Sequence, residues 1–171
     1  MNILHEIVVS KETNVKQRIM RLKNYASALI FIFILESGFT LKDKSLGDTP
    51  INWTDIELAQ KLAKEAPKKV FIDFTAKWCG WCKVMDKKTF TDPEVADYMN
   101  KNYYAVKMNF DSKETFSYLG ETYTAKQLAE KYGITGLPTM LLASADFKTI
   151  EQIVGYHKPN PFIKRLKAFN E

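Results

Sequence analysis

The chain contains very few cysteines and histidines. Its 171 residues include two of each, Cys79, Cys82, His5 and His157. Two cysteines are too few for the disulfide framework of a small secreted scaffold, so the fold has to rely on a hydrophobic core. The length and the 46% hydrophobic content are sufficient for one domain with such a core.

The sequence also lacks internal repeats and long apolar runs. The net charge of +5 comes mostly from scattered lysines, without a basic block that is interleaved with aromatic residues. We therefore expect no nucleic-acid partner. No apolar run reaches the roughly 20 residues of a membrane-spanning helix.

The N-terminal region has the layout of a secretory signal. Basic residues precede an apolar run at 26–35, and small residues follow it. We expect an exported leader at 1–37, a linker at 38–50 and a folded domain at 51–171, in the periplasm or another extracytoplasmic compartment. An N-terminal membrane anchor and a buried core helix are alternatives for the apolar run, and Met20 is an alternative start of translation.

Periodicity and capping residues predict the elements of the domain. Helices are expected at 54–66, from about Cys79 to 90, at 94–101 after Asp92-Pro93, at 124–133, and after Asn160-Pro161, with strands at 70–75, 103–110, 136–143 and 149–156. This order predicts an α/β fold with a mixed central β-sheet and helices on both faces.

The cysteines lie in FTAKWCGWCK, residues 74–83, where such a pair could bind a metal, form a static disulfide or carry out redox exchange. A structural zinc site needs four ligands, and outside the leader only His157 could join the cysteines, so we predict no metal. A static disulfide over two intervening residues closes a tiny loop and stabilises little. Redox exchange is favoured, because the pair lies between a buried strand and a helix start.

The helix start gives the two cysteines different predicted roles. Unpaired backbone N–H groups and the positive end of the helix dipole stabilise a thiolate there. Cys79, at the exposed end, is the expected nucleophile toward a substrate disulfide. Cys82, nearly one turn deeper, is the expected resolving thiol, which attacks Cys79 and releases the reduced substrate.

Asp73 is the one charge in the predicted buried strand at 70–75. Burial makes a carboxylate costly to ionise, so we expect its pKa to be raised. Asp73 could then accept the proton of Cys82 as that thiol attacks. An inert, hydrogen-bonded carboxylate is the alternative.

Two stretches, VFIDF through WCGWCK and KYGITGLPTMLLA (residues 131–143), resemble the thioredoxin superfamily. Residues 74–95 are similar to the periplasmic C-terminal domain of the bacterial transmembrane thiol reductase of the DsbD type. The resemblance covers roughly residues 50–170 and implies the thioredoxin fold. It also implies that Pro138 is cis and faces the cysteines, and that the backbone of Leu137 pairs with substrate. An ordinary trans proline is the alternative.

The resemblance implies further site residues. KMNFD, residues 107–111, looks like the strand that carries a lysine close to the buried aspartate, so Lys107 would tune Asp73 unless it is simply solvated. Trp78 would shape the substrate groove. Gly80 and Trp81 occupy the positions that help to set the redox poise, and Trp81 contacts partners or merely packs. Residues 112–124 are longer than the corresponding thioredoxin connection and are a candidate for partner choice.

These observations predict an exported thiol–disulfide oxidoreductase that reduces protein disulfides. It would act as a monomer without a dissociable cofactor, and a separate membrane or soluble protein would supply electrons. The alternatives are a disulfide oxidase or isomerase, and a non-catalytic module that binds a client or a metal.

Overall fold

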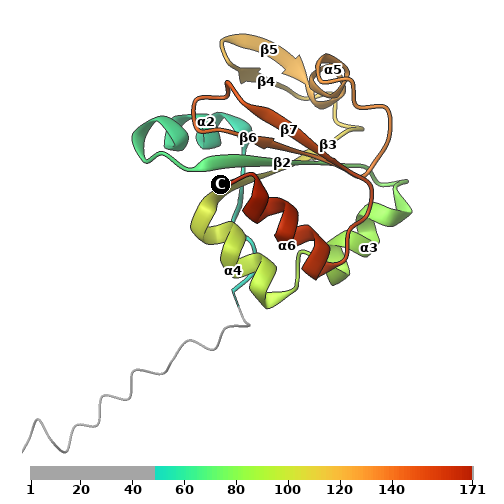
Figure 1. Cartoon of the computed structure of the whole chain (residues 1–171). Helices are drawn as coiled ribbons and strands as arrows, with labels where there is room; N and C mark the ends of the chain where they lie inside the picture. Colours follow the sequence, from blue (N-terminus) through green and yellow to red (C-terminus); the bar gives the residue numbers. More distant parts are fainter. Residues whose placement is uncertain (1–48, 171) are drawn as a thin grey trace, which may run out of the picture. The chain divides into compact units, whose positions relative to one another are not determined.

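A five-stranded sheet forms the centre of residues 49–170, which are the residues that this computed structural model describes (Figure 1). The elements in chain order are β1 (Trp53–Thr54), α2 (Ile56–Glu65), β2 (Lys69–Thr75), α3 (Gly80–Lys88), α4 (Pro93–Asn102), β3 (Tyr103–Asn109), β4 (Thr115–Tyr118), β5 (Glu121–Thr124), α5 (Ala125–Lys131), β6 (Thr139–Ala143), β7 (Ile150–Val154) and α6 (Pro159–Ala168). The predicted leader, its membrane anchor, the start at Met20 and nearly all of the linker lie outside the described residues. Between residues 49 and 170, no helix has the length and apolar character needed to cross a membrane.

The central sheet has the strand order β1-β3-β2-β6-β7. Strands β1, β3 and β2 are parallel, whereas β6 runs antiparallel to β2 and β7 antiparallel to β6. Strands β4 and β5 form a separate two-stranded hairpin. The sheet is therefore mixed, as predicted.

Strand β2 is buried on both faces, and its side chains alternate between two hydrophobic clusters. Phe71 belongs to one cluster, while Ile72 and Phe74 belong to the other. Because side chains alternate along a strand, Asp73 points to the same face as Phe71. This alternation decides which helices surround the only charged side chain within the buried part of β2.

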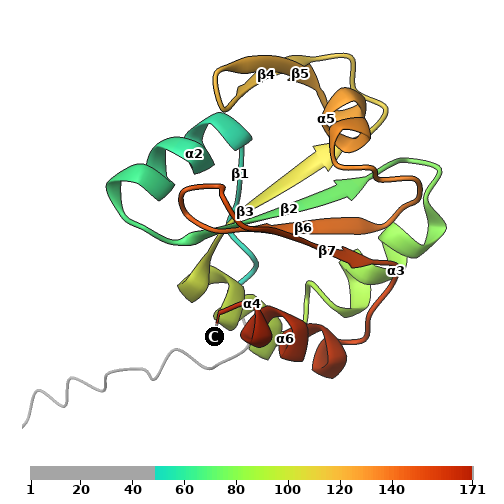
Figure 2. The same ribbon diagram turned by 45° about the horizontal axis from the view of Figure 1, so that its top comes forward.

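Helices cover both faces of the sheet (Figures 1 and 2). Helices α3, α4 and α6 contribute Met85, Met99 and Phe162 to the cluster that contains Phe71. Helices α2 and α5 contribute Ala59 and Leu128 to the opposite cluster. The predicted α/β architecture is thus confirmed, and Asp73 faces the side of the sheet that carries α3.

Two helices begin at other residues than the sequence predicts. Helix α2 was expected from residue 54, but it begins at Ile56, because the Asp55 carboxylate caps it by accepting the Leu58 N–H at 2.7 Å. Residues 53–54 instead form β1, which the sequence did not predict.

The last helix also starts differently. Asn160 was expected to cap it, but α6 begins at Pro159 and its N-cap is Lys158, which makes no side-chain capping hydrogen bond. Lys158 is extended, as a residue before proline usually is, and Pro159 has the fixed φ that suits a first helical position. Asn160 also precedes a proline but is already part of the helix. Pro161 is tolerated because it lies in the first turn.

The long connection at 112–124 is an ordered hairpin. Its strands β4 and β5 meet at a turn formed by Leu119 and Gly120, which both have positive φ. The side chain of Gln60 on α2 bonds the Ser117 C=O and the Leu119 N–H, each at 2.8 Å. The hairpin is therefore fixed to α2.

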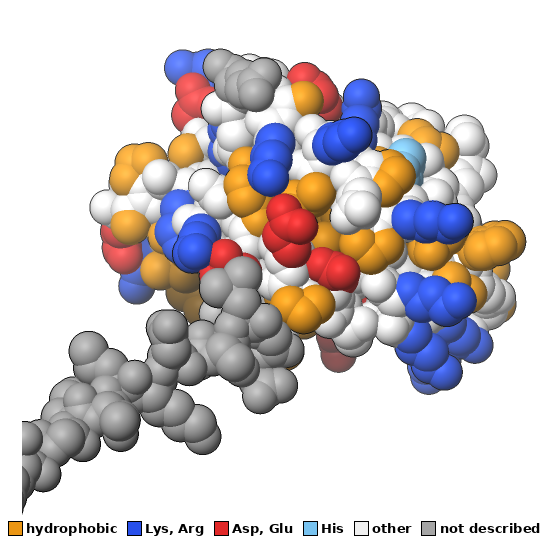
Figure 3. Space-filling view, turned by 60° about the horizontal axis from the view of Figure 1, so that its bottom comes forward, with side chains coloured by type: hydrophobic (Ala, Val, Ile, Leu, Met, Phe, Trp, Pro, Cys, Tyr) orange, Lys and Arg blue, Asp and Glu red, His pale blue; other side chains and the backbone are white. Residues whose placement is uncertain are grey.

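Charged side chains are spread over the surface of the domain. On the face shown in Figure 3, lysine and arginine side chains are dispersed, and acidic and hydrophobic side chains lie between them.

Candidate active site

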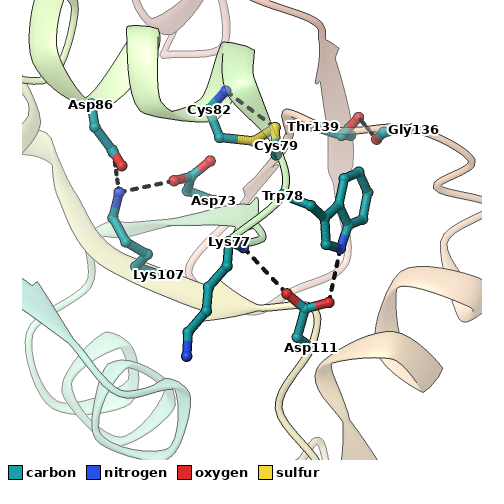
Figure 4. The surroundings of a disulfide bond; sticks show 10 residues. All are labelled: Asp73, Lys77, Trp78, Cys79, Cys82, Asp86, Lys107, Asp111, Gly136 and Thr139. Atoms are coloured by element: carbon teal, nitrogen blue, oxygen red, sulfur yellow. Dashed lines mark hydrogen bonds and ion pairs between the residues drawn. A yellow bond between two sulfur atoms is a disulfide. The ribbon is translucent and has the colours of Figure 1, made fainter.

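The cysteines form a disulfide where β2 leads into α3 (Figure 4). Cys79 is the N-cap of α3, and its Sγ accepts the Cys82 N–H at 3.1 Å. The predicted difference in exposure is not seen in this disulfide, because Cys79 is only 4% exposed and Cys82 is 3% exposed. Phe110 and Leu137 pack against the cluster that the two cysteines form with Ala76.

Metal-ligating side chains do not gather around this pair. In the part of the chain that the structure describes, no three His, Cys, Asp or Glu side chains are placed to hold a metal ion.

Asp73 lies on β2 and is 2% exposed. Burial raises the pKa of its carboxyl from 3.8 to about 6, although the nearby Lys107 ammonium acts in the opposite direction. The group is therefore able to change protonation state near neutral pH, as a proton acceptor must.

Lys107 is the cross-strand neighbour of Asp73, on β3. Its Nζ lies 3.2 Å from Asp73 Oδ2 and also forms an ion pair with Asp86 (Figure 4). The ammonium lies over two aromatic rings, 4.4 Å from the centroid of Trp53 and 5.0 Å from that of Phe90. Lys107 is thus held between β2 and α3 and is only partly solvated.

Asp86 is a site residue that the sequence reasoning missed. It lies on α3 four residues after Cys82, so the two side chains share one face of the helix. The negative charge of Asp86 contributes to the raised pKa of Asp73. The i,i+4 spacing from Cys82 was a signal, but only the packing of α3 on β3 links Asp86 to Lys107.

Trp78 is anchored at the edge of the site by a second missed residue, Asp111. The indole Nε1–H donates to Asp111 Oδ1 at 2.9 Å, and the Lys77 backbone N–H donates to Asp111 Oδ2 at 3.2 Å (Figure 4). Trp78 remains 65% exposed. An indole that is fixed by hydrogen bonding yet exposed is suited to contacting a partner.

The loop before β6 brings Leu137 and Pro138 to the site. The Leu137–Pro138 peptide bond is cis, and Leu137 packs against the cysteines. The hydroxyl of Thr139, the first residue of β6, donates to the Gly136 C=O of this loop at 2.8 Å (Figure 4). The structure therefore brings together the predicted residues at the cysteine turn and in this loop.

Trp81 lies on α3 and has other neighbours than Trp78. Its indole is 61% exposed and stacks on Tyr156, which the sequence reasoning also missed. Gly80, between the cysteines, is the first residue of α3, and no atom beyond its chain neighbours and the adjacent helix backbone lies within 4 Å of the position that a β-carbon would take there. Steric crowding therefore does not explain why residue 80 is a glycine.

Comparison with known proteins supports one family. A family model described as a thioredoxin-like domain matches residues 56–170. Thioredoxin H-type from Oryza sativa subsp. indica is 33% identical over 120 residues, which cover 68% of this chain and 84% of the rice protein. Thiol:disulfide interchange protein DsbD from Photorhabdus laumondii subsp. laumondii is 32% identical over 118 residues, but the chain spans only 19% of that protein.

The likeness extends to a solved structure of one such domain. The oxidised C-terminal domain of Neisseria meningitidis DsbD superposes with a TM-score of 0.51 and 26% identity, over 66% of this chain and 90% of that domain. The predicted thioredoxin fold is therefore confirmed. With a disulfide at the start of α3 and a family match over residues 56–170, the chain belongs to the thioredoxin-like family, and its domain resembles that of DsbD.

Proposed function

We propose that this chain is a thiol–disulfide oxidoreductase that reduces disulfides of protein substrates in an extracytoplasmic compartment. The observation that carries the proposal is the Cys79–Cys82 disulfide at the start of α3, on the sheet face where Asp73 is buried. Similarity to thioredoxin H-type and to the thiol:disulfide interchange protein DsbD supports it. The signal-like leader is the support for the compartment.

The first step forms a mixed disulfide. In the reduced protein, the Cys79 thiolate attacks one sulfur of the substrate disulfide, and the other substrate sulfur leaves as a thiolate. The free N–H groups at the start of α3 stabilise the Cys79 thiolate before the attack, as the Cys82 N–H does for the Sγ in the oxidised form. The substrate segment binds to a surface that is formed by Leu137, Pro138, Trp78, Gly80 and Trp81.

The second step closes the disulfide that the structure contains. Cys82 passes its proton to Asp73 and attacks Cys79 Sγ, which releases the second substrate sulfur. Two electrons have then moved from the protein to the substrate. The Lys107 ammonium positions the Asp73 carboxylate. Because the disulfide must be reduced again, the cycle needs a separate electron-donor protein, and we propose that the chain acts on these partners as a monomer.

Reduction of insulin by the purified domain, with dithiothreitol as the electron source, tests the proposal. We expect turnover by the native protein and none by Cys79→Ser. A Cys82→Ser variant should accumulate mixed disulfides through Cys79, because the resolving thiol is missing. Absence of turnover in the native protein, or full turnover in Cys79→Ser, would refute the enzymatic function.

The reduction potential of the Cys79–Cys82 pair tests the direction of transfer. A value near that of thioredoxin, about −270 mV, is expected for a reductase. A value near that of DsbA, about −120 mV, would identify an oxidant and contradict this part of the proposal.

A further inference from the structure

Trp81 and Tyr156 form an aromatic pair beside the disulfide. Their ring centroids are 5.4 Å apart and their planes are inclined by only 24°, so the rings are stacked. Trp81 belongs to α3, whereas Tyr156 belongs to the segment between β7 and α6, which runs beside α3 in both ribbon views (Figures 1 and 2). The stack therefore joins the cysteine turn to a distant part of the chain.

An uncharged groove of about 390 Å³ lies against this pair. It is lined by Trp81, Leu137, Pro138, Gly155 and Tyr156. Leu137 also packs against the small cluster that holds Cys79 and Cys82, so this wall of the groove adjoins the surroundings of the disulfide. A side chain next to a substrate cysteine would enter it.

The position of Tyr156 in the groove is set by the backbone. The Gly155 N–H donates to the Pro138 C=O at 2.9 Å, which continues the β6–β7 pairing beyond Thr139 and Val154. This bond holds Tyr156 at a defined distance from Pro138. Tyr156 is half-buried and packs against the cluster of α3, α4 and α6, while its Trp81 partner is 61% exposed.

We propose that Tyr156 is a specificity-determining residue, which holds the Trp81 indole as the wall of a site for an aromatic or large aliphatic side chain beside the substrate cysteine. This inference rests on the proposed reductase function. Aromatic rings and aliphatic chains gain contact with the stacked rings, whereas a carboxylate would lose water without gaining a partner in an uncharged groove. The substrates are thus extended segments in which the reactive cysteine is flanked by an apolar residue.

The test measures the single-turnover rate at which the reduced domain reduces a peptide disulfide. Matched peptides carry one cysteine, as a mixed disulfide with 2-mercaptoethanol, and differ only in Phe, Ala or Asp next to that cysteine. The protein gives two electrons to each peptide disulfide, releases the peptide thiol and 2-mercaptoethanol, and becomes oxidised. Acid quenching and mass spectrometry give the rate, which is divided by the rate of the same variant with hydroxyethyl disulfide.

The native protein should prefer the Phe peptide over the Asp peptide by at least about twofold and by up to about tenfold, the range expected for one aromatic contact. Tyr156→Ala should bring this normalised ratio close to one, because Trp81 loses its support. Tyr156→Phe retains the stacked ring and should retain the preference. Val154→Ala is the matched control, since Val154 is an exposed apolar residue on β7 that does not line the groove.

Three outcomes would overturn the inference. They are equal rates of the native protein with all peptides, an unchanged preference in Tyr156→Ala, and loss of the preference in Tyr156→Phe. If the native protein reduces hydroxyethyl disulfide and reduces all three peptides at equal rates, only this inference is refuted. A native protein that reduces no disulfide at all refutes the proposed function itself.

Discussion

The titration of Asp73 depends on its burial and on two neighbouring charges. Burial is the largest contribution and raises the pKa of the carboxyl, Lys107 lowers it, and Asp86 raises it again. Burial prevails even though Lys107 Nζ lies at 3.2 Å, because that ammonium is shared with Asp86. A shared cation compensates each carboxylate less than a dedicated one would.

Replacing Asp73 should stabilise the protein at alkaline pH. Its pKa is raised from 3.8 to about 6, so between these values the folded protein binds more protons than the unfolded chain. Stability is therefore lost as pH rises through about 6, by up to about 3 kcal/mol. We expect Asp73→Asn to have a higher free energy of unfolding than the native protein at pH 8, but not at pH 4, in urea titrations of the oxidised form.

The opposite sign would show that the ion pair with Lys107 outweighs burial. Asp97→Asn is a suitable control, because Asp97 is a partly exposed carboxylate paired with Lys101 on α4.

Removing the charge of Asp86 should lower the pKa of Asp73. Asp86→Asn eliminates the negative charge that raises this pKa and leaves Lys107 to Asp73 alone. Carbon-13 NMR titration of the Asp73 carboxyl should show a lower midpoint in this variant than in the native protein. An unchanged midpoint, equal to that of the Asp97→Asn control, would mean that Asp86 has no electrostatic effect on the site.

The β4–β5 hairpin has an unfavourable backbone conformation at its turn. Its turn places Leu119 at φ 52°, a left-handed conformation that side chains other than those of Asn and Asp rarely adopt. The hydrogen bonds from Gln60 to the hairpin hold this turn against α2. Leu119 is 51% exposed, so burial does not compensate for its conformation.

Leu119→Asn should therefore stabilise the domain by about 0.5–1 kcal/mol, because asparagine tolerates positive φ. Leu119→Ala shortens the same exposed side chain but keeps an unfavourable residue in the turn, so it serves as the control. The midpoints of urea unfolding should rise for the first variant only. Equal effects of both variants would assign the change to lost apolar surface and not to the backbone.

The stability of the whole domain depends on an aromatic cluster under α4 and α6. Phe162 is completely buried and contacts Phe71 and Phe90 in edge-to-face geometry, with ring centroids 5.9 Å and 5.8 Å away. Phe90 precedes α4 and Phe71 lies on β2, so Phe162 attaches the last helix to the sheet.

Phe162→Ala should lower the free energy of unfolding by about 3–5 kcal/mol, because it removes a large ring and leaves a cavity between α6 and the sheet. Phe162→Leu fills most of that space and should cost clearly less. Calorimetry or urea unfolding measures both. A loss below about 1 kcal/mol for the alanine variant would mean that α6 contributes little to the core.

Much of the fold follows from local patterns in the sequence. Asp92-Pro93 begins α4 as expected, since its capping bonds involve only neighbouring residues. The buried run at 70–75 became β2, and Gly133 adopts a positive φ just after α5. The β4–β5 hairpin was missed because its turn is Leu-Gly, which is not a favoured hairpin signal.

The candidate site likewise contains residues that local sequence patterns predict and residues that they do not. Cys79, Cys82 and Asp73 were identified because the cysteine spacing and a charge inside an apolar strand can be read within ten residues of sequence. Asp86, Asp111 and Tyr156 were missed because their roles depend on contacts with residues 21 to 75 positions away. The sequence alone therefore accounts for the cysteine pair and the buried carboxylate near it. The packing of α3 against β3 and the β7–α6 segment determines which charges and rings surround them, because these contacts exist only when the chain is folded.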